Sequence, residues 1–211
     1  MSSEQTYNIS FTAGALMVNE TSAVAEVYLE QDGDWEKTRA IALQQNVMEK
    51  DKMSTNQRLF SLVRQRLETL TESEMQLLVE GAANVKRLIT YLAVCKAHTF
   101  ISDFVMSNIR DSFFNMNEKV SHANFNEFFN EKKYVHPELE AITDKTVAKI
   151  RQIVFRIFEQ SELIESVETG ILQRPYLPEK VERAIVQDDS KWLAAFLYSN
   201  NEISNAINLY E

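Results

Sequence analysis

Four long polar side chains, all with hydrogen-bond donors, recur at helical spacing near the middle of the C-terminal half: Lys145, Lys149, Gln152 and Arg156. Their separations of 4, 3 and 4 residues place them on one side of a helix, and apolar residues of the same segment recur on the opposite side. Such donors bind phosphate oxygens, so this basic stripe is a candidate surface for the DNA backbone. The solvated face of an ordinary amphipathic helix has the same pattern, and that alternative stays open.

The segments around the basic stripe follow the order of a winged helix-turn-helix. Predicted helices at 122–133 and 143–160 flank a turn at Pro137, and two short β-capable runs within 163–174 predict a hairpin after them. Arg174, at the end of that hairpin, would lie near a neighbouring phosphate. Five other basic residues are secondary DNA-binding candidates, should the stripe prove to be solvated surface only: Arg58, Arg64, Arg66, Lys86 and Arg87.

Motifs that would indicate an enzyme or a metal site are absent from the sequence. The three histidines have no ligand spacing, and Cys95 lies in an apolar run, which is typical of a buried and inert thiol. Four isolated glycines cannot form a phosphate-binding loop or a nucleophile elbow. The sequence therefore predicts a non-enzymatic protein with no metal, no cofactor and no small-molecule substrate.

The elements that must position the stripe are predicted to be helices. The chain has 211 residues but only four Gly and three Pro, whereas average usage would give about 12% of the two together. Sandwiches and barrels need many turns, so we expect an all-α, multi-helix globular protein with at most one short hairpin. Capping residues and apolar periodicity predict helices over 13–29, 35–48, 54–70, 72–80, 84–97, from 99 onward, 122–133, 137–142 and 143–160, with two more beginning at 178 and 190.

Two further features concern the organisation of the chain. The polar stretch 115–124 is the best linker candidate, and it predicts an N-terminal helical domain over 1–115 and a C-terminal, winged-helix-like domain over 116–211. Trp35 directly follows the capping residue Asp34, and we expect its ring to pack against the first helix near Tyr28.

The net charge of −9 is distributed unevenly along the chain. Residues 1–36 carry −7 and residues 157–211 carry −6, whereas the middle of the chain, 37–156, carries +4. A basic middle is compatible with a local DNA-binding patch, because such a patch acts within about one Debye length. The acidic ends would suit docking to other proteins.

Several observations predict the compartment. One cysteine fits a reducing cytosol. No apolar run approaches the roughly 20 residues that a bilayer span requires. The first 36 residues hold no Lys or Arg and so lack the basic start of a signal peptide. We therefore expect a cytoplasmic protein that does not enter a membrane.

A set of short strings runs in one order from residue 10 to about residue 175. They are SFTAG at 10–14, AEVY at 25–28, DW at 34–35, LAVCK at 92–96, FFNEK at 128–132, HPEL at 136–139 and KIRQ at 149–152. None of them is a catalytic motif, but in this order and spacing they resemble the BrxA family of the BREX bacteriophage-exclusion systems.

This resemblance implies a small, all-helical, non-enzymatic BREX component, similar in fold to the NusB-type antitermination proteins, that binds nucleic acid. It favours a DNA-binding accessory protein of a phage-defence system that contacts double-stranded DNA mainly through phosphates and works with other BREX proteins. The alternative is an adaptor that assembles larger BREX components without contacting DNA. The family has also carried an inner-membrane label, which this sequence contradicts because no segment is long and apolar enough to span a bilayer.

Overall fold

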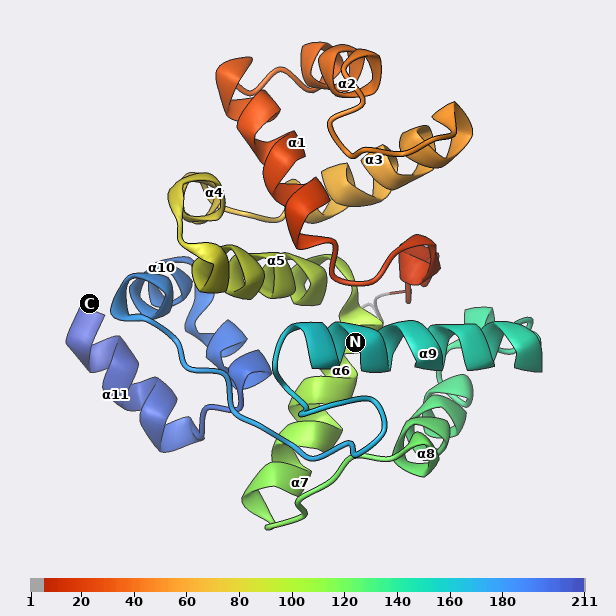
Figure 1. Ribbon diagram of the computed structural model, residues 1–211. Helices are drawn as coiled ribbons and strands as arrows, with labels where there is room; N and C mark the ends of the chain where they lie inside the picture. The colour runs from red at the N-terminus through yellow and green to blue at the C-terminus, as the bar shows by residue number, and fades with distance from the viewer. Residues whose placement is uncertain (1–5, 211) are drawn as a thin grey trace.

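The computed structural model describes residues 6–210, and this part of the chain is built from helices and contains no extended strand. The predicted all-α class is therefore confirmed. Figure 1 shows α5 crossing the middle of the molecule, with α1, α2 and α3 on one side and α6, α7 and α9 on the other. The elements in chain order are η1 (Ser10–Ala13), α1 (Val18–Glu30), α2 (Trp35–Gln44), α3 (Met53–Leu67), α4 (Glu72–Glu80), α5 (Ala83–Ala97), α6 (Thr99–Phe104), the π-helical η2 (Val105–Ile109), α7 (Arg110–Phe114), α8 (His122–Lys133), η3 (Pro137–Leu139), α9 (Asp144–Gln160), α10 (Glu179–Asp189), η4 (Ser190–Phe196) and α11 (Asn200–Tyr210).

Side-chain caps define several helix starts where the sequence predicts them. The Asp34 carboxylate accepts hydrogen bonds from the first turn of α2. Thr71 and Glu74 form a reciprocal capping box at α4, and Thr143 accepts from the backbone of Thr146 at α9. These caps satisfy amide groups that a helix leaves without partners at its start, and the three helices begin within one residue of the predicted positions 35, 72 and 143.

The first helix begins later than the sequence predicts. A single 3-10 turn, η1, comes first, and α1 starts at Val18 after Met17, which has a left-handed backbone with φ of 62°. Phe11 of η1 and Leu16 of the intervening loop are both fully buried. A continuous helix from residue 13 is therefore replaced by a turn, a loop and a shorter helix.

The predicted hairpin over 163–174 is not formed. Ile164 and Leu172 make one isolated antiparallel bridge, and Ile171 makes a second with Lys119 from the polar stretch before α8. Gly170 has φ of 61°, and a Cβ there would collide with the carbonyl oxygen of Val120. This crowding shows why glycine occupies the position. Because the segment divides its backbone bonds between two neighbours, it forms no two-stranded wing.

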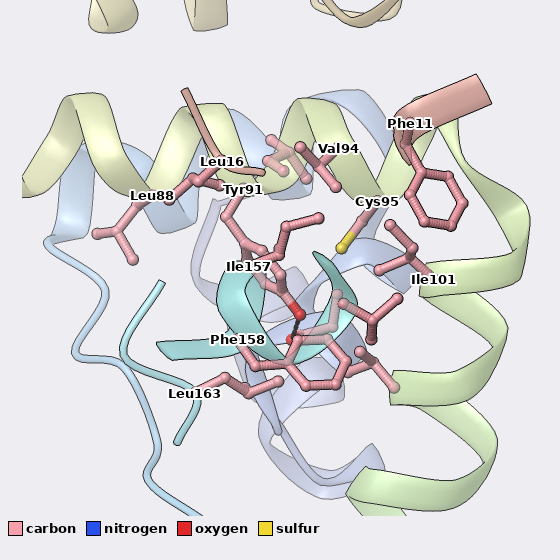
Figure 2. Packing of buried hydrophobic residues seen from close by; sticks show 14 of the residues in the cluster. Phe11, Leu16, Leu88, Tyr91, Val94, Cys95, Ile101, Ile157, Phe158 and Leu163 are labelled. Atoms are coloured by element: carbon pink, nitrogen blue, oxygen red, sulfur yellow. Dashed lines mark hydrogen bonds between the residues drawn. The ribbon is translucent and has the colours of Figure 1, made fainter. Parts of the chain in front are cut away.

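The buried residues form one hydrophobic cluster that extends from Tyr7 to Ala206 and so includes both predicted domains. Figure 2 shows Phe11 and Leu16 of the N-terminal segment in this cluster together with Ile157 and Phe158 of α9. The N-terminal segment is thus packed against the helix that carries the basic stripe. The domain boundary and the likeness to NusB-type or winged-helix folds stay predictions.

Two other expectations concern packing and membranes. The rings of Trp35 and Tyr28 lie with their centroids 4.1 Å apart and their planes tilted by 30°, which confirms the predicted contact, although Trp35 is only partly buried. Over residues 6–210 no single helix has the length and apolarity to cross a membrane. The segments 83–97 and 99–114 reach that threshold only jointly, across a bend of 102°.

Candidate nucleic-acid interface

The basic stripe lies on the exposed side of α9, as the sequence predicts. Lys145, Lys149, Gln152 and Arg156 are all exposed. The opposite face packs into the core through Ile150, Val154 and Ile157, none of which is accessible to solvent. Because one face is anchored in the core and the helix start is capped, the stripe has a fixed orientation relative to the rest of the molecule.

Little within the protein neutralises the charges of this stripe. The Lys149 ammonium donates to the Gln152 amide oxygen at 3.1 Å, a neutral partner. Arg156 reaches a carboxylate, that of Glu159, at 3.3 Å, and the arginine remains 58% exposed. Lys145 makes no ion pair with any residue from 6 to 210. The stripe therefore presents cations with much of their capacity for phosphate still available.

The fold adds one secondary candidate to the stripe. Arg58, on α3, is exposed and lines the same cavity as Lys149, where α3, η1 and α9 meet. The two residues are far apart in the sequence, and their meeting depends on η1 packing against both helices. Arg58 forms no ion pair within the described part of the chain. Together, Arg58 and the stripe form the candidate interface.

Arg66 was a secondary candidate, and its burial excludes direct contact with DNA. Its side chain is fully buried and donates to the carbonyl oxygens of Ala15 at 2.8 Å and Leu16 at 3.0 Å. Burial lowers the pKa of this arginine to about 9. The neighbouring His98 accepts from the Arg66 Nε at 3.4 Å, and burial followed by the arginine charge lowers the His98 pKa to about 3. Arg66 therefore holds the loop between η1 and α1.

The other secondary candidates are engaged by groups of the protein itself. Arg64 donates to the Glu68 carboxylate at 2.8 Å, and Arg87 donates to Glu162 at 2.7 Å. Lys86 donates to a serine hydroxyl of α1 at 3.1 Å. The positive charges of Arg64 and Arg87 are thus partly neutralised, and both side chains would have to give up an existing contact to bind phosphate.

Arg174 lies in a different setting from the one that the predicted hairpin implied. Its guanidinium donates to Glu202 of α11 at 2.7 Å and lies over the Tyr198 ring at 4.2 Å from the ring centre. The cavity that it lines also includes Glu179 and Glu182. The structure therefore groups Arg174 with acidic residues of the C-terminal helices and not with the stripe.

The sequence pattern did not single out a second basic pair beside the stripe. Arg151 on α9 and Lys133 on α8 line a cavity of about 300 Å³ between these helices. The Arg151 guanidinium donates to the Asn126 amide oxygen at 2.8 Å. Arg151 lies on the flank of α9 and not in the stripe, so the helical spacing that identified the stripe did not include it.

No three His, Cys, Asp or Glu side chains between positions 6 and 210 are placed to hold a metal ion. Burial raises the pKa of the Cys95 thiol to about 12, so the thiol is protonated at neutral pH. Protonated thiols are poor nucleophiles.

Comparison with known proteins identifies a matching family profile and two similar proteins that carry the family's name. The sequence profile of the BrxA family matches residues 5–189. A protein named BREX protein BrxA from Escherichia coli O9:H4 (strain HS) is 25% identical over 164 residues, which cover 78% of this chain and 76% of that protein. A second BREX protein BrxA, from Paramagnetospirillum magneticum (strain ATCC 700264 / AMB-1), is 25% identical over 166 residues, which cover 79% and 83%.

A solved structure has the same fold. The crystal structure of an uncharacterized protein from Magnetospirillum magneticum superposes with a TM-score of 0.80 and 22% identity, covering 92% of this chain and 98% of the other. At that identity the likeness concerns the fold alone. The family match, by contrast, extends from before η1 to the end of α10 and includes every element of the candidate interface. The chain therefore belongs to the BrxA family.

Proposed function

We propose that this protein is a non-enzymatic, DNA-binding accessory component of a BREX phage-defence system, acting in the cytoplasm with other BREX proteins. Membership of the BrxA family supports the role in defence. The main support for DNA binding is the group of exposed cations on α9 and α3. Three of them, Arg58, Lys145 and Lys149, have no carboxylate partner among the described residues.

The proposed mode of binding is contact with the phosphate backbone of duplex DNA. Lysine and arginine side chains on one helix face can follow a row of phosphates, and such contacts carry no direct information about base sequence. Binding releases condensed counterions, so the affinity should fall steeply with salt. The acidic ends of the chain would keep other surfaces from binding DNA and leave them for protein partners.

The test is duplex binding by fluorescence anisotropy at several salt concentrations, with two duplexes of unrelated sequence. The triple variant Lys145→Gln, Lys149→Gln, Arg156→Gln removes three phosphate contacts. The slope of log affinity against log salt should flatten by about 0.9 per lost contact, or about 2.7 in total. The loss of affinity should be similar for both duplexes, because phosphates carry no base identity.

A matched control removes three positive charges elsewhere. Lys180, Arg183 and Lys191 are exposed residues of the acidic C-terminal region, and Arg183 and Lys191 already pair with carboxylates. Changing all three to Gln should leave the salt slope unchanged. Equal losses in both triple variants would overturn the proposed interface. The absence of duplex binding by the unmodified protein at low salt would overturn DNA binding and favour an adaptor that joins larger BREX components.

A further inference from the structure

The cavity shared by Arg58 and Lys149 has the chemistry of an anion site. It has a volume of about 580 Å³ and lies between η1, α3 and α9. Polar groups contribute most of its lining, and none of its lining residues is acidic: the polar ones are Ser10, Thr12, Arg58, Ser61, Gln65 and Lys149. Two cations together with hydroxyl and amide groups match a phosphate, whose oxygens accept several hydrogen bonds at once.

Several donors in this cavity remain available. The Arg58 side chain makes no hydrogen bond or ion pair to any residue that the structure describes. The Lys149 ammonium donates one of its three N–H groups to Gln152, and the other two remain available. Ser10 donates to the Gln65 amide oxygen at 3.3 Å, which orients that amide and leaves its nitrogen as a donor. An arriving phosphate would therefore not have to displace an internal carboxylate.

The walls of the cavity are held in place before any ligand binds. Phe11, in the middle of η1, is fully buried and packs against the His98 ring. The loop after η1 is bound to both helices of the cavity: Arg66 of α3 donates to its carbonyl groups, and the Leu16 amide donates to Gln160 of α9 at 3.0 Å. Because these walls are already ordered, binding a ligand between them has a lower entropic cost.

We propose that this cavity is a phosphate seat, which binds one phosphate group between Arg58, Lys149 and the hydroxyl of Thr12. The volume falls within the range of about 300–1,000 Å³ that is usual for ligand pockets, so part of an attached sugar also fits. The proposal rests on the proposed function in one respect: in a DNA complex the seated group is a backbone phosphate beside the basic stripe. Without DNA, inorganic phosphate or a free nucleotide supplies the same chemistry.

The first test uses inorganic phosphate as the probe. Phosphate is titrated at constant ionic strength while the backbone amide signals of η1 are followed by NMR in three proteins: unmodified, Arg58→Gln, and Lys180→Gln. Lys180 is exposed and lies outside both the cavity and the basic stripe, so its variant is a control with the same loss of charge. We expect saturable shifts in the unmodified protein and the control, and about tenfold weaker binding in Arg58→Gln. Shifts without saturation, or equal weakening in both variants, would overturn the seat.

The second test separates the seat from the proposed function. Thr12→Val and Arg58→Gln are assayed for duplex binding beside the triple stripe variant, and duplex is added to the phosphate-loaded protein. If the seat takes a backbone phosphate, both variants lose affinity and duplex displaces inorganic phosphate. If duplex binds normally to both variants, the seated group is not a backbone phosphate, so the DNA role of the seat is overturned while the stripe stands. If inorganic phosphate saturates the cavity but duplex does not bind, the seat stands for a free phosphate or nucleotide and DNA binding is overturned.

Discussion

The cations around the phosphate seat and those of the C-terminal helices differ in what surrounds them. Near the seat, Arg58 faces no acidic lining residue, and Lys149 has a neutral partner. In the C-terminal region, Arg174 pairs with Glu202 at 2.7 Å, and Arg183 pairs with an acidic residue of its own helix at the same distance. The contrast shows that counting basic residues does not measure the capacity to bind phosphate. Local pairing decides which of them are available.

The largest expected effect concerns the buried arginine that holds the wall of the seat. Arg66→Met removes the donors to the Ala15 and Leu16 carbonyl groups and leaves these acceptors without a partner. The free energy of unfolding should fall by about 3 kcal/mol or more, since each unsatisfied buried polar group costs about 1–3 kcal/mol. Urea unfolding measures this change.

Arg58→Met is the matched control, because Arg58 lies on the same helix and is exposed. Its effect on unfolding should stay within about 0.5 kcal/mol, as is usual for surface substitutions. Similar stability losses in the two variants would show that Arg66 does not act as an internal anchor, and the rigid wall inferred for the seat would be lost with it.

A second effect is the pH dependence that His98 adds to stability. Burial and the Arg66 charge lower the pKa of His98 to about 3 in the folded protein, from an ordinary value of 6.5. Below pH 6.5 the unfolded chain therefore binds a proton that the folded protein does not. This contribution to stability is complete above pH 6.5 and is lost as the pH falls, at about 1.4 kcal/mol per unit.

The variant His98→Gln keeps a hydrogen-bond acceptor near Arg66 but does not titrate. Between pH 7 and pH 5, the unmodified protein should lose about 2 kcal/mol more stability than this variant. Carboxylates titrate in both proteins, so the difference isolates His98. Parallel stability curves for the two proteins would contradict a buried, neutral histidine beside Arg66.

The smallest effect is expected at the paired cations of the C-terminal region. Arg174 and Glu202 are 30% and 40% exposed in their side chains, so solvent screens their attraction. A double-mutant cycle with Arg174→Met and Glu202→Gln should give a coupling of at most about 1 kcal/mol. Duplex affinity should be unchanged in Arg174→Met. A marked loss of DNA affinity there would break the contrast between the two regions.

Sequence reasoning succeeded where the signal is local. The stripe and the core face of α9 follow from spacing alone, and the start of this helix follows from Thr143. Another local signal was overlooked: Ser199 and Glu202 form a capping box at α11, with the Ser199 amide donating to the Glu202 carboxylate at 2.7 Å. The spacing Ser-x-x-Glu is the usual signature of such a box, so this helix could have been predicted.

Sequence reasoning was wrong where distant segments compete for the same backbone groups. The runs within 163–174 have the composition of a hairpin, but the segment around Lys119 takes one side of the pairing. Nothing in the composition of either run reveals that third partner. Strand pairing depends on long-range contacts, and these are not encoded in the propensity of a short segment.

The sequence by itself determined the helical class, the capped starts of α2, α4 and α9 and the exposed basic stripe, because each depends on residues within a few positions of one another. Only the tertiary structure decided which cations are available. It buried Arg66, paired Arg174 with a carboxylate, and brought Arg58 beside Lys149. The physical reason is that desolvation and ion pairing depend on neighbours in space, and helix packing sets those neighbours from residues far apart in the chain.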